Sequence, residues 1–434
     1  MGIQPGWPRA IVTAAATVIL TTSTAAPADK LQPDDLVKQV LAGNPGVAAL
    51  EAAVKAAEAR IGPAGSLPDP ELRLAVAPRT VDGFTTPAGQ HRGVSGIVEI
   101  SQSLPWPGTL GLRADVARHE AAAAGEEVAS LRLQLAAATR SRYAEWFYVH
   151  RALAINASNQ QLTEELRRVA ERRYATGLAE QQDVLQAEVE LQRLREQALV
   201  LEQRRATIRA RTNALFSREA DAPLPAPADM PAADPLPAYA SLRALALRRH
   251  PALQRLDRRI AASRDREALA DKAFYPDLRV MAGNNDFRPA SETRFTVGVG
   301  ISLPLDQDKR RAARDAARAD TMRLDFEHRD QRNRLLGELE AARAAAEQAR
   351  ASVDLYRREL VPRTQESLSA ARAAYGSGGG SFLAVITAEQ QQLDAELNLA
   401  RARADYFIAR AELARWAGGE LPDPAATGNP ETNP

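Results

Sequence analysis

The chain has 434 residues, of which 45% are hydrophobic, 5% are aromatic and none is cysteine. Its 56 basic and 55 acidic residues give a formal net charge of +1, so nothing in the composition suggests a nucleic-acid-binding protein, which needs a concentrated basic surface. Without cysteine, disulfides and thiolate metal sites are excluded. Few aromatic residues with abundant alanine and arginine favour long helices over a thick globular core.

Residues 1–28 have the three parts of a secretory signal peptide. Arg9 supplies the positive charge, residues 11–20 form a short apolar core, and small residues follow at 23–28 as a cleavage site. The apolar run is shorter than the ~20 residues of a membrane-spanning helix. We therefore predict an exported protein, which can be periplasmic, secreted or built into an outer membrane through strands.

Several short motifs recur in the same order along the chain, which indicates an internal duplication. The matching pairs are Pro70-Glu71-Leu72-Arg73 with Pro276-Asp277-Leu278-Arg279, Ile100-Ser101 with Ile301-Ser302, and Tyr174-Ala175-Thr176-Gly177 with Tyr375-Gly376-Ser377-Gly378. Asn44-Pro45 and His250-Pro251 open helical runs in the same way. One match could be chance, but an ordered series predicts two copies of one unit.

Each unit is predicted as a helix, two strands, a very long helix, a tight turn and a last helix. The first repeat covers residues 29–216, with strands at about 70–77 and 94–104 and a long helix at about 108–174. The second covers 240–418, with strands at about 276–284 and 294–304 and a long helix at about 308–375. Residues 217–239 are predicted as a Pro-rich connector and 419–434 as a disordered tail.

The long helices set the architecture. About 65 residues at ~1.5 Å each make a rod of about 100 Å, which needs partners along its whole length. An extended coiled-coil stalk is the simplest interpretation. Pro362 lies inside the second long helix and should bend or loosen it.

The strands point to a membrane or to a soluble hairpin. Phe295, Val297 and Val299 alternate with small or polar residues, as in a transmembrane β-strand, but a hairpin with one face on a core alternates in the same way. Four strands cannot close a pore, and open edges are not tolerated in lipid. If these strands span a membrane, several chains must pool them, and three chains would give twelve.

The junction Pro105-Trp106-Pro107 lies between a strand and a long helix. Pro105 ends the strand and Pro107 suits the first turn of the helix. Trp106 is expected either at the lipid–water boundary or packed into a strand–helix corner. The second copy has Leu303-Pro304-Leu305-Asp306 here, with Asp306 as a helix N-cap and no tryptophan.

With these features the chain resembles the TolC family of trimeric outer-membrane efflux channels, over residues 31–418. The resemblance is carried by the duplicated unit, the junction and the two turn motifs, and the Leu-Pro-Trp-Pro-Gly form looks most like the heavy-metal branch, such as CzcC. It implies a mainly α fold with a small membrane β part, in which a homotrimer forms a twelve-stranded β-barrel continued by a long α-helical barrel.

The resemblance also implies a function. The protein would be a passive conduit of a tripartite efflux system in the outer membrane of a Gram-negative bacterium, embedded in lipid and extending into the periplasm. A periplasmic adaptor would connect it to an inner-membrane pump, expected to be of the RND type, that delivers small molecules or metal ions. The alternative is an exported coiled-coil structural or adhesive stalk without a pore.

The two helical tips are the predicted docking sites for the adaptor. The residues assigned to them are Arg173, Tyr174, Gly177, Leu178, Val184, Tyr375, Gly378, Phe382, Leu383 and Val385. The glycines permit a tight reversal, and Leu178, Phe382 and Leu383 are expected to be exposed apolar contacts. Any helical hairpin could use the same turn residues.

The entrance gate is predicted at Arg172 and Asp183, with Arg173 and the two tip tyrosines nearby. In the family, acidic residues often narrow the entrance from the second copy, but this chain has Ala384 and Thr387 there. The histidines are scattered without ligand spacing, and no phosphate loop or catalytic triad is recognisable. We predict no enzymatic activity, no cofactor and no dedicated metal site.

Overall fold

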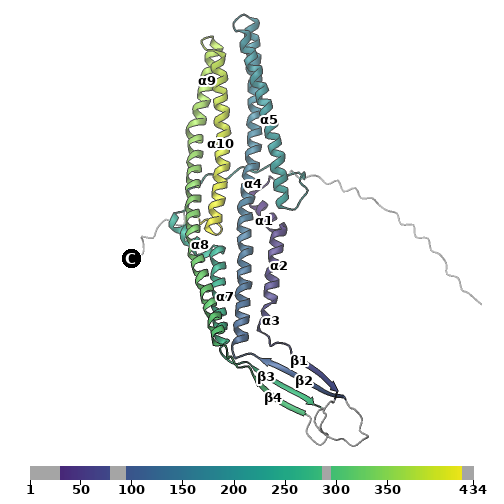
Figure 1. Ribbon diagram of the computed structural model, residues 1–434. Coiled ribbons are helices and arrows are strands. Elements are labelled where there is room, and N and C mark those ends of the chain that lie inside the picture. Colours follow the sequence, from purple (N-terminus) through teal and green to yellow (C-terminus); the bar gives the residue numbers. More distant parts are fainter. Residues whose placement is uncertain (1–29, 79–93, 286–294, 423–434) are drawn as a thin grey trace, which may run out of the picture.

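The computed structural model describes residues 30–78, 94–285 and 295–422, so the predicted signal peptide and most of the predicted tail lie outside the described residues. The described chain is an elongated, mainly helical rod with a small sheet at one end. At the other end lie the turns of two helical hairpins, α4–α5 and α9–α10 (Figure 1). In order, its elements are α1 Pro33–Gly43, α2 Pro45–Ala59, α3 Ile61–Gly65, β1 Glu71–Pro78, β2 Val94–Leu104, α4 Thr109–Ala175, α5 Gln181–Leu215, α6 Tyr239–Arg249, α7 Pro251–Lys272, β3 Leu278–Asn285, β4 Phe295–Ile301, α8 Gln307–Leu355, the π-helical turn η1 Tyr356–Leu360, α9 Val361–Ser377 and α10 Phe382–Ala417.

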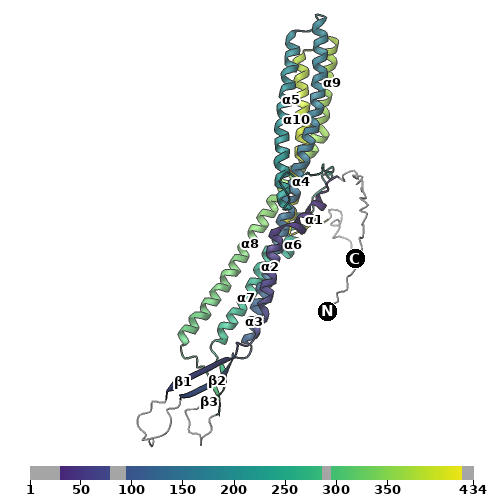
Figure 2. The same ribbon diagram turned by 90° about the vertical axis from the view of Figure 1, so that its right-hand side faces the viewer.

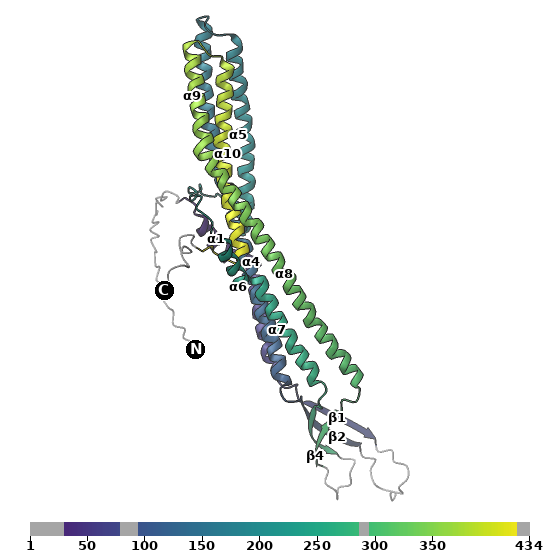
Figure 3. The same cartoon turned by 90° about the vertical axis from the view of Figure 1, so that its left-hand side faces the viewer.

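The rod has two parts along its length, each a bundle of helices. Near the turns, the hairpins α4–α5 and α9–α10 lie side by side, whereas nearer the sheet α2, α4, α7 and α8 run together (Figures 2 and 3). Alanines are fully buried where these helices meet, among them Ala144, Ala170 and Ala346. Small side chains let helix backbones approach closely along the rod. None of the helices within the described ranges is long and apolar enough to cross a membrane.

The first helical segment of each repeat is broken at a proline. Asn44 caps α2 by accepting a hydrogen bond from the Gly46 amide at 2.9 Å, and Pro45 is the first helical residue. In the second repeat, the His250 Nδ1 accepts from the Ala252 amide at 3.2 Å ahead of Pro251. A proline at the first position suits a helix start because its missing N–H would have no partner there.

The second long helix is not continuous. The helix expected at about 308–375 consists of α8, the π-helical turn η1 and α9, whereas α4 runs unbroken for 67 residues. Pro362 is the second residue of α9, after Val361, and cannot donate a backbone hydrogen bond, so the turn of helix before it widens.

The four strands form one antiparallel sheet in the order β1-β2-β3-β4, with β1 and β4 at its edges. The register pairs Leu74 with Val98, Ile100 with Ala282, and Ala282 with Val297. Side chains directly opposite each other share a face, so most of the apolar positions of the four strands lie on one face of the sheet. They are exposed in the single chain; Val297, for example, is 67% exposed.

The opposite face of the sheet carries mostly polar or small side chains, together with Met281 and Ile97. Arg279 on β3 donates to Glu71 on β1 at 2.9 Å, across the intervening strand. On β4, Gly298 and Gly300 lie against the Met281 side chain, where an added Cβ would lie 3.2–3.3 Å from it. Small residues here leave room for Met281.

The Pro-rich connector is irregular but attached to the rod at several points. The Tyr143 hydroxyl donates to the Ala228 carbonyl at 2.9 Å, and the Trp146 indole N–H donates to the Pro225 carbonyl at 2.9 Å. From α10, the Tyr406 hydroxyl donates to the Asp234 carbonyl at 2.6 Å. Buried aromatic side chains thus satisfy backbone carbonyls that have no secondary-structure partner.

Candidate functional site

The strand–helix junction brings the two repeats together. Between β2 and α4, the Trp106 ring stacks on the Tyr275 ring with centroids 4.9 Å apart, and the Trp106 amide donates to Asp277 Oδ1 at 2.9 Å. Both partners come from the second repeat. Pro105 and Pro107 flank this contact, and Gly108 follows with φ +87° as the N-cap of α4. Trp106 is half-buried, so it packs at the corner; its position at a lipid boundary stays a prediction.

The two tips are tight reversals built on glycine. Gly177 has φ +72° and Gly378 has φ +84°, a region that glycine adopts without strain. The last carbonyls of each helix are satisfied within the turn: the Leu178 amide donates to the Arg173 carbonyl at 2.8 Å, and the Gly379 amide donates to the Ala374 carbonyl at 3.0 Å. Both turns therefore end their helices with a left-handed glycine.

Arg173 joins the two tips. From α4, its guanidinium donates to the Tyr375 carbonyl at 2.6 Å and to the Gly376 carbonyl at 3.1 Å. The same group lies over the Tyr375 ring, 4.7 Å from its centroid. The sequence assigned Arg173 to adaptor docking and to gating alike, and both roles stay predictions; the structure shows that its donors hold the neighbouring tip.

Tyr375 is the centre of this contact. Its residue is 5% exposed, and its hydroxyl donates to Asp183 Oδ2 at 3.0 Å. Burial, and then the hydrogen bond to the Asp183 carboxylate, raise the pKa of Tyr375 to about 12. The phenol therefore stays a neutral donor at physiological pH. The structure brings Asp183 and Arg173 to Tyr375, whereas Arg172 lies exposed on α4.

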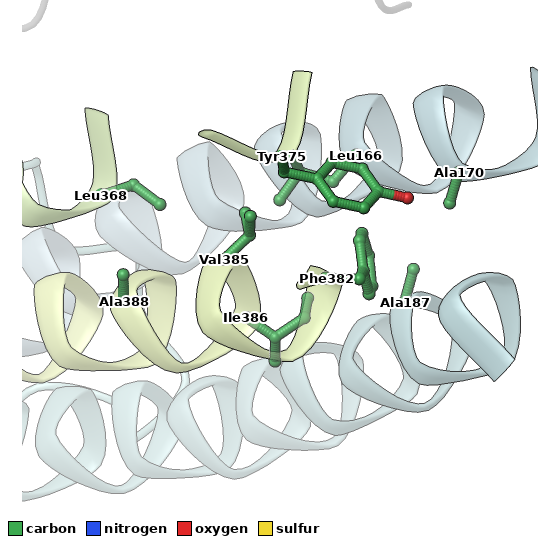
Figure 4. Packing of buried hydrophobic residues seen from close by; sticks show 9 residues of the cluster. All are labelled: Leu166, Ala170, Ala187, Leu368, Tyr375, Phe382, Val385, Ile386 and Ala388. Atoms are coloured by element: carbon green, nitrogen blue, oxygen red, sulfur yellow. The ribbon is translucent and has the colours of Figure 1, made fainter. Parts of the chain in front are cut away.

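Three of the predicted docking residues are buried, namely Tyr375, Phe382 and Val385. Phe382 was expected to be exposed, but it is 2% exposed and packs edge-on against Tyr375 with ring centroids 5.3 Å apart. Val385 is fully buried as well. Figure 4 shows these side chains gathered with Leu166, Ala170 and Ala187 from the other hairpin. The prediction of an exposed Phe382 is wrong because the second hairpin turns this side of α10 towards α4 and α5.

Of the remaining tip residues, some are exposed and one packs against the cluster that the two hairpins share. Leu178 is 68%, Leu383 60% and Tyr174 49% exposed, so these can meet a partner directly. Val184 is partly buried and packs against the shared cluster of the two hairpins. Two further exposed apolar residues, Leu185 and Val189, were missed from the sequence. Their spacing of four on α5 was the available signal, since it places them on one helix face.

Sequence reasoning also missed a buried acidic pair below the tips. Glu389 on α10 is 2% exposed and its carboxylate oxygen Oε1 contacts the Thr163 hydroxyl of α4. Glu190 on α5 is 6% exposed and accepts from the Gln390 amide at 2.7 Å. Nothing in the sequence marked Glu389 as special, because the first repeat has the same residue, Glu188, at the equivalent position. In the structure Glu188 is exposed. Among the described residues, no three potential metal ligands come together.

The comparison with protein families decides the identity of this chain. A family model described as outer membrane efflux protein matches residues 36–216 and 242–419. The chain belongs to the outer membrane efflux protein family. The resemblance to TolC-type channels is thereby confirmed, whereas membership of the CzcC-like branch stays a prediction.

Solved structures of efflux channels share the fold of this family member. The outer-membrane channel OprN is 21% identical with a TM-score of 0.75, covering 96% of this chain and 99% of that one. VceC from Vibrio cholerae is 20% identical with a TM-score of 0.73, covering 89% and 96%. CusC is 17% identical with a TM-score of 0.76, covering 90% and 93%. No curated protein sequence matches the chain significantly.

Family membership confirms the predicted function and location. The protein is an outer-membrane channel component of a tripartite efflux system and extends into the periplasm. The family is a class of passive conduits and not a class of enzymes. The alternative of a poreless adhesive stalk is set aside.

Proposed function

We propose that three copies of this chain close into a twelve-stranded barrel in the outer membrane, continued through the periplasm by a barrel of their long helices. The observation that carries the proposal is the sheet, on which Leu72, Leu74, Val76, Val98, Ile100, Val280, Phe295, Val297, Val299 and Ile301 share one face and are exposed in the single chain. Such a face suits contact with lipid, and the polar face with Arg279 and Glu71 suits a water-filled interior.

The two edge strands support the same conclusion. β1 and β4 lie at opposite edges of the sheet, so each presents a row of backbone groups on its outer side. Unpaired backbone groups are not tolerated in the hydrocarbon core of a membrane. Pairing of β1 of one copy with β4 of the next satisfies both edges and closes a ring.

Assembly can be tested with two adjacent substitutions on β4. Val297→Lys puts a charge on the apolar face, which at mid-membrane costs about 2–4 kcal/mol, whereas Thr296→Lys puts the same charge on the polar face. We expect the wild type and Thr296→Lys to be trimers in the outer-membrane fraction, and Val297→Lys to be depleted from it. A wild-type chain that remains a monomer without detergent, or equal assembly of both variants, would contradict the proposal.

We further infer that the tips receive a periplasmic adaptor, which links the channel to an inner-membrane pump of the RND type. Leu178, Leu383 and Tyr174 are the direct contacts in this proposal because they are exposed beside the glycine turns. Arg173, Val184, Tyr375, Phe382 and Val385 support them from within the hairpins. Transport of metal ions, as the branch resemblance predicts, would depend on the pump that delivers them.

The same tips form the proposed entrance gate. Asp183 accepts from Tyr375, and Arg173 holds the backbone of the second tip, so both contacts tie the two hairpins together. Arg172 is kept in the proposal as an exposed positive charge beside them. In planar bilayers, we expect Asp183→Ala to raise the closed-state conductance, while Glu180→Ala, an exposed neighbour, leaves it unchanged. Equal conductance of Asp183→Ala and the wild type would remove Asp183 from the gate.

A further inference from the structure

A buried polar cluster joins the two hairpins below the tips. Glu389 of α10 meets Thr163 of α4, and Gln390 of α10 donates to Glu190 of α5. Both carboxyl groups lie in the interior of one chain, at 2% and 6% exposure. Burial of two acidic groups whose charges act on each other is costly unless one of them is neutral.

The hydrogen count at Thr163 is consistent with a neutral Glu389. A threonine hydroxyl has a single hydrogen, yet Thr163 Oγ1 lies within bonding distance of both the Asn159 carbonyl, at 2.8 Å, and Glu389 Oε1. When the hydroxyl donates to Asn159, the contact with Glu389 needs a hydrogen on the carboxyl group. The other oxygen, Oε2, is buried without a hydrogen-bond partner, as suits a protonated acid better than a carboxylate.

The charged groups around Glu389 come from two of the helices packed against it. Glu190 on α5 is negative, and Arg372 on α9 is positive, while α4 contributes the uncharged Thr163. Glu190 has its own compensation, because it accepts from Gln390 and lies 3.7 Å from Arg193. Glu389 is therefore the member of the pair that is left to take up a proton.

We propose that Glu389 is a proton-dependent latch between the two hairpins. With its carboxyl protonated, the hairpins pack through Thr163. Loss of the proton places two negative side chains in one buried site and loosens α10 from α4 and α5. The latch concerns contacts inside one chain, so it does not depend on the tips being the channel entrance.

The pH range of the latch follows from the position of Glu389. Burial, more than the neighbouring Glu190 charge, raises the pKa of Glu389 to about 7 from its ordinary value of 4.5. The packed state thus holds the proton more tightly than an opened state with an exposed carboxyl. Packing is strongest at acidic pH and weakens as the pH rises through about 7. Between pH 6 and pH 8 the opening equilibrium should increase about tenfold.

Backbone hydrogen exchange of the full-length protein in detergent tests the latch. After correction for the intrinsic exchange rate, we expect the segment 382–393 of the wild type to open about tenfold more at pH 8 than at pH 6. Glu389→Gln keeps the shape of the protonated acid and should abolish this change, with greater protection than the wild type at pH 8. Glu188→Gln, the equivalent exposed position, should behave as the wild type.

Two results would overturn the proposal: a wild-type segment whose corrected exchange is the same at both pH values, or a Glu389→Gln variant that keeps the full response. If Glu389→Gln does not assemble, Glu190→Gln provides the second test. It removes the neighbouring negative charge and should reduce the pH response, and an undiminished response would count against the latch.

Discussion

The two repeats place equivalent residues in different surroundings at the tips. Tyr174 of the first repeat is 49% exposed, whereas its equivalent Tyr375 is 5% exposed and donates a hydrogen bond to Asp183. Glu188 and Glu389 differ in the same way. The second hairpin turns these side chains towards the first, so the repeats share a turn motif while the second one supplies the contacts between the hairpins.

The long helices of the repeats also start differently. α4 begins after Gly108, which has φ +87° and no side-chain cap, whereas α8 begins after Asp306, which accepts from the Lys309 amide at 2.9 Å. The predicted N-cap at Asp306 is thus present in the structure. In the first repeat the stacking of Trp106 on Tyr275 fixes the corner instead. A helix start can therefore be specified locally by a cap or at longer range by an aromatic contact.

The largest expected effect separates the two tip tyrosines. Tyr375→Ala removes a buried ring, its hydrogen bond to Asp183 and its contact with Arg173, and should lower the free energy of unfolding by about 3–5 kcal/mol. Tyr174→Ala at the exposed position should change it by no more than about 0.5 kcal/mol. Denaturant unfolding of the two variants measures the difference, and similar losses would contradict the asymmetry between the repeats.

A pH effect should separate the two proline-linked caps, Asn44 and His250. Burial, and then the Arg415 charge, lower the pKa of His250 to about 4 from 6.5. The unfolded chain therefore takes up this proton first as the pH falls. The contribution of neutral His250 to the free energy of unfolding is complete above about pH 6.5 and is lost towards pH 4, by up to about 3 kcal/mol.

The variant His250→Asn copies the cap of the first repeat and has no titrating group. We expect the unfolding midpoint of the variant to rise relative to that of the wild type as the pH falls from about 6.5 to 4, because other titrating groups, Glu389 among them, act in both proteins alike. The absolute stability at neutral pH is not the readout, because the stacking of His250 on Trp416 is lost as well. Parallel pH profiles of variant and wild type would show that another group titrates.

A smaller effect concerns the start of α4. Gly108→Ala forces a side chain into the left-handed region and should cost about 1–2 kcal/mol. Gly111 lies three residues on, inside the helix, where an added Cβ meets nothing within 4 Å. Gly111→Ala should therefore stabilise the protein by roughly 0.5–1 kcal/mol. Thermal unfolding should show shifts of opposite sign, and an unchanged or higher midpoint for Gly108→Ala would mean that the turn is not strained.

The smallest effect concerns the cap of α8. Asp306→Ala removes the acceptor of the Lys309 amide and should cost about 1 kcal/mol, whereas Asp306→Asn keeps an acceptor and should cost less. Unfolding midpoints of the two variants test this. If both lose the same stability, the charge and not the hydrogen bond supports the helix start.

The sequence by itself predicted the kinds of element and much of what they do. Alternation at Phe295, Val297 and Val299 predicted a strand, and proline and glycine predicted the junction and the tip turns. Pro362 predicted that the second long helix bends or loosens locally. These signals are local, because they depend on backbone geometry or on the period of one element. The ordered motifs likewise carried the resemblance that family membership confirmed.

Only the tertiary structure decided which side chains face one another. The sequence assigned Phe382 to the surface and gave no reason to separate Glu389 from Glu188, because motif similarity does not contain the rotation of one hairpin against the other. The register between β2 and β3 and the contact between Arg173 and Tyr375 also join residues far apart in the chain. Burial and charge compensation at such places depend on packing across repeats, so they become visible only when the whole chain is folded.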